Sequence, residues 1–234
     1  MKRIAILTSF IALVTFATAL AGNGSQEKET RNLSGFTKVS FGISGDLYIS
    51  LGNEFKVVLE GDKGVLRDIE TEVSNDRLII RKDNWRFNSN EKVTVYITMP
   101  VIKGLGVSGS GKAEIKDAVK TENLSLSVSG SGKLYVNEIF VNEVDASISG
   151  SGDIFARGAG EASKSDISIS GSGNYSGESL KIKTAEISIS GSGNCTCYVT
   201  EMLKASVSGS GNVSYNGSPK IDARVSGSGK VRSK

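Results

Sequence analysis

The chain has 234 residues, enough for one large all-β domain or two small ones, with 28 glycines and only two prolines. It has no histidine, so we expect no enzyme of the Ser-His-acid kind. Without Lys2 and Arg3 the 28 basic residues fall to 26 against 25 acidic ones, and this near-neutral balance excludes a nucleic-acid binder that works by neutralising phosphates.

Residues 1–21 have the pattern of a secretory signal peptide. Lys2 and Arg3 begin it, residues 4–20 are apolar or small, and Ala19 and Ala21 form a small-x-small cleavage sequence. The apolar run is short for a bilayer span and contains threonines, and no other stretch is long and apolar enough to cross a membrane. We therefore expect export to the periplasm, the outer-membrane surface or the medium, with no membrane-spanning segment in the mature chain.

Residues 33–101 alternate in polarity without a fixed repeat. Residues 22–32 are polar, and we expect a flexible lead-in there. The expected elements that follow are strands over 36–41, 46–51, 55–59 and 93–97, a helical turn over 63–68, a hairpin of 69–73 and 77–82, and a loop over 83–90 whose Trp85 and Phe87 cover an open end of the core. Irregular end elements are typical of repeat proteins, so residues 33–101 are predicted to be the N-terminal β cap of a single domain over 33–234.

The sequence Ser-Gly-Ser-Gly recurs seven times in residues 102–234. The copies begin at Ser108, Ser129, Ser149, Ser170, Ser190, Ser208 and Ser226, so the steps are 21, 20, 21, 20, 18 and 18 residues. A fixed period near 20 is typical of stacked coils, and the apolar columns beside each copy are separated by even numbers of residues, as in strands. The pattern predicts an all-β, right-handed β-solenoid with rungs of about 18–21 residues and stacked copies. If strands run through the motif, both glycines face inward and both serines outward.

The order of motifs resembles a known family. It consists of residues 35–39 (Gly-Phe-Thr-Lys-Val), 45–49 (Gly-Asp-Leu-Tyr-Ile), 69–73 with 78–80, and then the repeated Ser-Gly-Ser-Gly. This chain resembles the putative auto-transporter adhesin, head GIN domain family over about residues 32–232. The resemblance implies an exported, β-helix-like domain of unknown function of the kind common in Bacteroidetes, with an adhesin-like role.

Two motifs have a functional and a structural interpretation. Residues 106–112 fit the G-x-x-x-x-G-K spacing of a phosphate-binding loop, but Ala113 stands where a magnesium-binding Ser or Thr is needed and strands surround it, so we interpret the motif as a corner. Cys195 and Cys197 stand in columns that are apolar in other rungs. We expect buried free thiols, with a strained disulfide as the alternative, and no metal site or cofactor.

Acidic residues are the remaining candidates for catalysis. The candidates are Asp145, Asp153, Glu161, Asp166, Glu186 and Asp222. We expect them not to recur in one column and to have no aromatic platform nearby, so we interpret them as solvated charges and predict no catalytic residues. Asn174, Asn194 and Asn212 follow three successive copies and predict a short asparagine ladder at a corner.

The sequence therefore predicts an exported, non-catalytic binding or structural module of the cell envelope. Its partner is expected to be a glycan or a surface protein, bound by an outward row of second serines of the motif: Ser110, Ser131, Ser151, Ser172, Ser192 and Ser210. An alternative interpretation of this row is that it only solvates a corner. Two other functions stay open, a polysaccharide-acting β-helix enzyme and an envelope signalling accessory.

Overall fold

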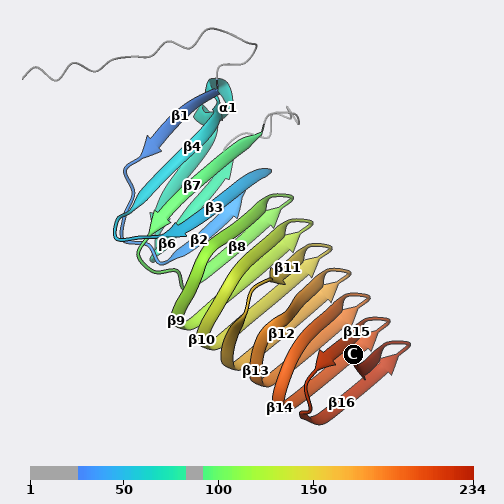
Figure 1. Ribbon diagram of the computed structural model, residues 1–234. Helices are drawn as coiled ribbons and strands as arrows, with labels where there is room; N and C mark the ends of the chain where they lie inside the picture. Colours follow the sequence, from blue (N-terminus) through green and yellow to red (C-terminus); the bar gives the residue numbers. More distant parts are fainter. Residues whose placement is uncertain (1–25, 83–91) are drawn as a thin grey trace, which may run out of the picture.

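A computed structural model describes residues 26–82 and 92–234. Within these residues the chain forms a continuous 17-stranded sheet that coils along one axis, with one short helix at the N-terminal end (Figure 1). The all-β solenoid is confirmed; its right-handed sense and its domain boundaries remain predictions. No helix in the described ranges has the length and apolar character that a bilayer crossing requires. The predicted signal peptide over 1–21 and the predicted loop over 83–90, with Trp85 and Phe87, lie outside the described residues.

The bounds of the elements show the change from a short-stranded cap to long-stranded rungs. They are β1 Gln26–Arg31, β2 Lys38–Gly42, β3 Gly45–Leu51, β4 Lys56–Asp62, α1 Lys63–Arg67, β5 Ile69–Ser74, β6 Arg77–Lys82, β7 Val93–Met99, β8 Gly104–Gly109, β9 Lys112–Gly130, β10 Lys133–Gly150, β11 Asp153–Ala156, β12 Gly160–Gly171, β13 Asn174–Gly191, β14 Asn194–Gly209, β15 Asn212–Asn216, β16 Lys220–Gly227 and β17 Lys230–Ser233.

The coil has two broad faces, and the long strands contribute to both. Face A runs in the order β1, β4, β7, β3, then through the first halves of β9, β10, β13 and β14 with β11 inserted, to β15 and β17. Face B runs β5, β6, β2, β8, then through the second halves of the long strands with β12 inserted, to β16. The long strands bend around one edge of the coil (Figure 1), and the Ser-Gly-Ser-Gly copies turn the chain at the other.

The seven copies stack in register, as predicted. Ser108 is level with Ser129, and the same match continues rung by rung to Ser208 and Ser226. Strands do not run through the motif, so the inward placement of both glycines does not apply. Each strand ends at the first glycine, which has a positive φ such as 109° at Gly130. That conformation is open to glycine at little cost and lets the chain turn. The second glycine is buried in the first six copies, and both serines are exposed in every copy.

The core lies between the two faces and is built by columns of apolar side chains. One such column contains Leu126, Ala146, Ile167, Ile187 and Ala205, all at most 3% exposed. No rung could bury both edges of its apolar strip alone, so each buried Ile or Leu stabilises the stack by roughly 1.5–3 kcal/mol only when its neighbours are present.

The N-terminal cap differs from expectation at its start. Residues 22–32 were expected to be a flexible lead-in, but Gln26–Arg31 form β1, which pairs antiparallel with β4. Ion pairs from Lys28 to Glu60 and from Lys63 to Glu27 attach this polar strand to the cap. The strand was not predicted because its sequence has no apolar periodicity. The predicted hairpin is confirmed as β5 and β6, which turn through Asn75 and Asp76 with φ of 49° and 60°. The predicted helical turn is α1, capped by the Asp62 side chain.

Candidate functional site

Face B carries an array of serine hydroxyls beside the corners. Two columns of outward serines stand in register along it, and the corner row runs next to them. We call these three sets the serine face: Ser127, Ser147, Ser168, Ser188 and Ser206; Ser108, Ser129, Ser149, Ser170, Ser190, Ser208 and Ser226; and Ser110, Ser131, Ser151, Ser172, Ser192 and Ser210. All of them are exposed. The predicted row is thus brought together as one edge of a wider hydroxyl surface.

The corner row is fixed by backbone hydrogen bonds between rungs. The amide of Ser131 donates to the Gly109 carbonyl at 2.9 Å, and the amide of Ser151 donates to Gly130 at 2.9 Å. Ser172, Ser192 and Ser210 repeat the contact with Gly150, Gly171 and Gly191 at 2.8–2.9 Å. The backbone therefore holds the row in place, and its hydroxyls project into solvent as donors and acceptors.

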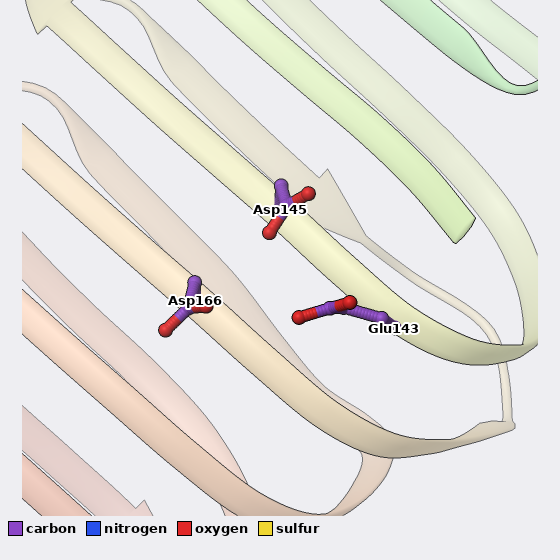
Figure 2. A group of neighbouring side chains, drawn as sticks. All are labelled: Glu143, Asp145 and Asp166. Carbon is purple, nitrogen blue, oxygen red and sulfur yellow. The ribbon is translucent and has the colours of Figure 1, made fainter.

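A shallow hollow of about 240 Å³ lies on face B where the serine columns meet acidic residues. Outward side chains of Ser125, Ser127 and Ser147 line it with those of Asp145, Asp166 and Ser168. The Asp145 and Asp166 carboxylates lie on adjacent rungs (Figure 2). These groups accept and donate hydrogen bonds over a small area, which is the chemistry that holds a hydroxyl-rich ligand.

The expectation that the acidic candidates do not share a column is wrong. Asp145 is level with Asp166, Asp166 with Glu186, and beyond Lys204 the same column ends in Asp222. All stand four residues before a Ser-Gly-Ser-Gly copy, so the fixed offset was a signal that the sequence contained. We call Asp145, Asp166 and Glu186 the acid ladder. Glu161 is exposed on β12, and Asp153 lies on face A.

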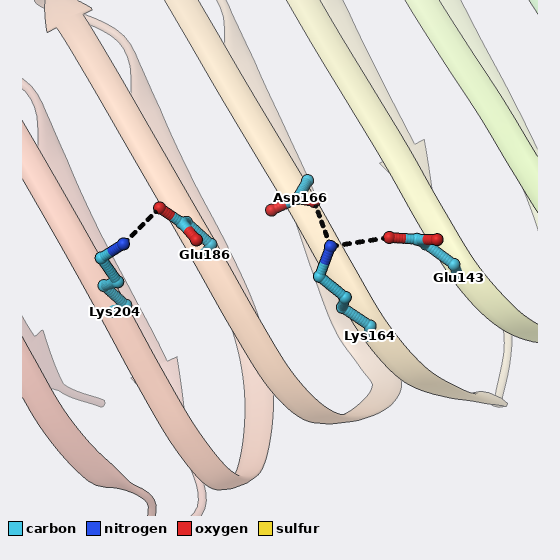
Figure 3. A network of polar contacts seen from close by, with 5 residues as sticks. All are labelled: Glu143, Lys164, Asp166, Glu186 and Lys204. Atoms are coloured by element: carbon cyan, nitrogen blue, oxygen red, sulfur yellow. Dashed lines mark hydrogen bonds and ion pairs between the residues drawn. The ribbon is translucent and has the colours of Figure 1, made fainter.

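Lysines neutralise part of this ladder (Figure 3). Lys164 Nζ lies 2.7 Å from both Glu143 Oε1 and Asp166 Oδ2, and Lys204 Nζ lies 2.6 Å from Glu186 Oε1. The hydrogen bonds to Asp166 and Glu143 raise the pKa of Lys164 above its usual value. Asp145 has no hydrogen bond or ion pair among the described residues. Burial raises the pKa of the Asp145 carboxyl, and Glu143 and Asp166 raise it further, against a lowering by Lys164.

Glu143, Asp145 and Asp166 are also the residues that could hold a cation. One carboxylate oxygen from each lies within 4.8 Å of the others (Figure 2). Oxygen ligands of this kind suit hard cations such as Ca²⁺. The Lys164 ammonium already bridges two of the three carboxylates, so it competes for the charge that would attract a metal (Figure 3).

Face A carries an aromatic column that the sequence analysis missed. Tyr96, Tyr48, Glu114, Tyr135 and Phe155 stand in register on five neighbouring strands. Tyr48 stacks on Tyr96 with ring centroids 5.8 Å apart, and Tyr135 on Phe155 at 4.9 Å with the planes 9° apart. The equal offset of Tyr135 and Phe155 from their copies of the motif would have revealed this column.

Cations cover the faces of these rings. The Arg157 guanidinium carbon lies 3.8 Å from the centre of the Tyr135 ring, and Lys116 Nζ lies 4.4 Å from that of Tyr48. Lys112 Nζ lies between the two rings, 5.9 Å from Tyr48 and 5.2 Å from Tyr135. The expected absence of aromatics near the acids is therefore wrong for Asp153, whose strand β11 carries Phe155. The hollow beside Asp145 and Asp166 is lined by serines, Leu126 and Ala146.

The remaining predicted features are structural. Asn174 donates to Asp153 at 2.8 Å, Asn194 to Asn174 at 3.0 Å, and Asn212 to Asn194 at 3.0 Å, so the asparagine ladder is confirmed. Strand β9 follows residues 106–111 directly, as a corner requires and a phosphate-binding helix does not.

Cys195 and Cys197 are free, buried thiols, 1% and 0% exposed, as predicted. The hydrogen bond to Cys197, and then burial, raise the pKa of Cys195 well above its usual value. A raised pKa keeps the Cys195 thiol protonated, and a protonated thiol is a poor nucleophile.

The fold and this surface define a β-solenoid whose outward faces are flat and polar. The model of the putative auto-transporter adhesin, head GIN domain family matches residues 35–219, and the chain belongs to that family. No curated protein matches the chain. This family relationship confirms the resemblance that the sequence motifs indicated. Adhesins are typically exported proteins.

Solved structures share the fold. A putative adhesin from Bacteroides fragilis NCTC 9343 is 24% identical, with a TM-score of 0.82 over 90% of this chain and 97% of that one. A putative lipid binding protein from Parabacteroides distasonis ATCC 8503 is 22% identical, with a TM-score of 0.69 over 91% and 98%. A putative adhesin from Parabacteroides merdae ATCC 43184 is 20% identical, with a TM-score of 0.70 over 91% and 98%. At these identities the likeness establishes the fold alone.

Proposed function

We propose that this chain is an exported, non-catalytic adhesin-like module that binds glycan chains along its serine face. Residues 1–21 direct export, and the solenoid that begins with β1 forms the single binding domain at the cell envelope or surface. The observation that carries the proposal is the serine face, where exposed hydroxyls repeat on successive rungs in strict register. Neighbouring strands lie about 4.8 Å apart, so the hydroxyls form a rigid row with a short repeat.

The shape of this surface favours a polymer over a small ligand. Small molecules bind in enclosed pockets of about 300–1,000 Å³, and the hollow beside the serine face is smaller and shallow. A glycan chain laid along the solenoid would exchange hydrogen bonds with several rungs at once. Each contact is weak, and their number supplies the affinity, while Asp145 and Asp166 in the hollow add two charged acceptors.

The alternative of a polysaccharide-acting enzyme finds less support. Such an enzyme needs two carboxylates in a cleft beside the sugar. Here the acid ladder lies on face B and the aromatic column on face A, and Lys164 holds Asp166 in an ion pair. Asp153, which lies near the aromatic Phe155, accepts a hydrogen bond from Asn174 and pairs with Lys133. The signalling alternative has no feature of the described residues in its favour.

The test is glycan-array binding with two matched triple variants. Ser151, Ser172 and Ser192 are each changed to Lys, which places bulky charges on three successive corners of the serine face. The control changes Ser176, Thr196 and Ser214 to Lys, which stand in register on three successive rungs of face A. Circular dichroism checks the fold of both.

We expect the corner variant to lose glycan binding at least about tenfold, as the loss of a few hydrogen bonds implies, and the control to keep it. Undiminished binding by the corner variant, or equal loss in both, would reject the serine face as the binding surface.

A further inference from the structure

The C-terminal end of the solenoid exposes side chains that belong to the core. In strand β16, Ile221 is 48% exposed and Val225 is 43% exposed. Their equivalents one rung earlier, Leu203 and Val207, are 0% and 2% exposed. The inward apolar column thus continues to the last rung, where no further rung covers it among the described residues (Figure 1).

Strand β16 is also an open hydrogen-bonding edge. Within the described residues it pairs only with β14, so one edge of its backbone has no strand partner. The opposite end of the solenoid is different, because β1 carries Glu27, Lys28, Glu29 and Arg31, with ion pairs to Lys63 and Glu60. Charged edge strands resist pairing. The charges of β16, Lys220, Asp222 and Arg224, all lie on its outward side, and its inward side is apolar, which favours pairing there. Head-to-tail stacking is therefore disfavoured, and end-to-end pairing of two C-terminal ends is favoured.

We propose that β16 pairs antiparallel with β16 of a second copy of this chain, about a two-fold axis at Ala223. In this register Ala223 faces Ala223 of the partner subunit, and Ile221 faces Val225 of the partner subunit on the inward side. On the outward side, Asp222 faces Arg224 of the partner subunit, and the symmetry makes this contact twice. The apolar columns of two solenoids then join into one core.

Charge complementarity selects this register. Asp222 and Arg224 have no ion pair within the described residues, although both stand on the exposed last rung. A two-fold axis at residue 222 places Asp against Asp, and an axis at 224 places Arg against Arg. A two-fold axis that passes between two residues would shift the register by one residue and so place the apolar inward side chains of one copy opposite the polar outward side chains of the other.

The first test is a site-specific cross-link in the exported chain. Residues directly opposite in an antiparallel pair have Cβ atoms about 4.5–5.5 Å apart, so Ala223→Cys places two thiols within reach of a short bismaleimide across the axis. The control is Ser226→Cys, whose copies lie roughly 20 Å apart in the same register at about 3.4 Å per residue. The native Cys195 and Cys197 are buried, so they give little background. We expect a cross-linked dimer with Ala223→Cys and none with Ser226→Cys.

The second test is a charge swap followed by sedimentation equilibrium. Arg224→Asp and Asp222→Arg each place like charges against each other at both symmetric contacts, and each should raise the dimer dissociation constant roughly 100-fold or more. The double variant D222R/R224D restores opposite charges and should recover most of the affinity. Lys181→Asp is the control, because it makes the same charge change on the exposed surface of β13, an inner rung away from the junction, and it should keep the dimer.

A wild-type chain that stays monomeric at all concentrations tested would overturn the proposal. So would a double swap no tighter than the single variants, or cross-linking that is equal at positions 223 and 226. These measurements need no glycan, so their outcome is independent of the proposed function.

Discussion

The second glycine of each motif copy sets how closely the rungs approach, and Gly193→Ala tests this. A Cβ at Gly193 would lie 2.5 Å from the Gly173 carbonyl oxygen and 2.5 Å from Ile169 Cγ2, where ordinary contact begins near 3.4 Å. The rungs would have to separate locally by about 0.9 Å, against a strand spacing of about 4.8 Å. The Asn194 amide already donates to the Gly173 carbonyl at 3.2 Å, so that hydrogen bond would break.

The expected cost follows from these two effects. Overpacking costs about 1–3 kcal/mol, and each of one or two lost backbone hydrogen bonds costs about 1 kcal/mol, so Gly193→Ala should destabilise the chain by roughly 2–5 kcal/mol. Gly109→Ala is the matched comparison. Its φ is 87°, yet an added Cβ meets nothing within 4 Å, so only backbone strain of about 1–2 kcal/mol is expected.

Guanidinium unfolding followed by circular dichroism measures both variants. Because solenoids can unfold in parts, amide hydrogen exchange at Asn194 and Asn212 gives a local measurement beside the global one. The faster exchange should be confined to the rungs next to Gly193. If Gly109→Ala is destabilised as much as Gly193→Ala, close approach of the rungs does not explain the second glycine.

Three further predictions concern titratable groups. Lys164→Met should raise the pKa of Asp145 in a carboxyl NMR titration, because Lys164 is the nearby charge that lowers it. An unchanged pKa would show that the Lys164 ammonium does not act on Asp145. Asp145→Asn should raise Tm at pH 7, because a carboxyl whose native pKa lies above its unfolded value destabilises the fold when it is ionised. This gain should shrink as the pH falls through the native pKa and vanish below 3.8, where the carboxyl is protonated in both the folded and the unfolded state. A gain in Tm that persists at low pH would have another cause. Cys195 and Cys197 should resist a thiol reagent in the folded chain and react fully in guanidinium, and rapid labelling of the native protein would refute their burial.

The fold was predictable because its repeat is written in the sequence at a fixed offset. The β-branched residue before each copy and the inward columns gave the register without coordinates, and the strand bonds confirm it from Ser108 to Ser226. The turn at each first glycine was not predictable from alternation, because alternation does not report φ. Strand β1 escaped prediction because ion pairs, and not apolar residues, attach it to the cap.

The candidate site was predictable in part. The corner serines were found by their motif, but the acid ladder was overlooked although Asp145, Asp166 and Glu186 share one offset. The partial neutralisation of the acid ladder could not be predicted from the sequence. Lys164 stands two residues before Asp166, in a neighbouring outward column, and only its side-chain conformation brings it to both Asp166 and Glu143. The aromatic column was visible in the sequence only where Tyr135 and Phe155 share an offset, because Tyr48 and Tyr96 lie on β3 and β7, strands outside the strict repeat.

Parallel stacking in register creates an electrostatic problem that this chain solves with lysines. Identical columns would place carboxylates about 4.8 Å apart on every rung, and like charges at that distance repel. Lys164 separates Glu143 from Asp166, and Lys204 ends the run of acids after Glu186. On the last rung Asp222 follows Lys204, whose ammonium is already bound to Glu186, and Arg224 follows Ser206. The last rung thus carries two opposite charges on one open strand, Asp222 in the acid column and Arg224 in a serine column, which is the arrangement that a second copy in antiparallel register satisfies.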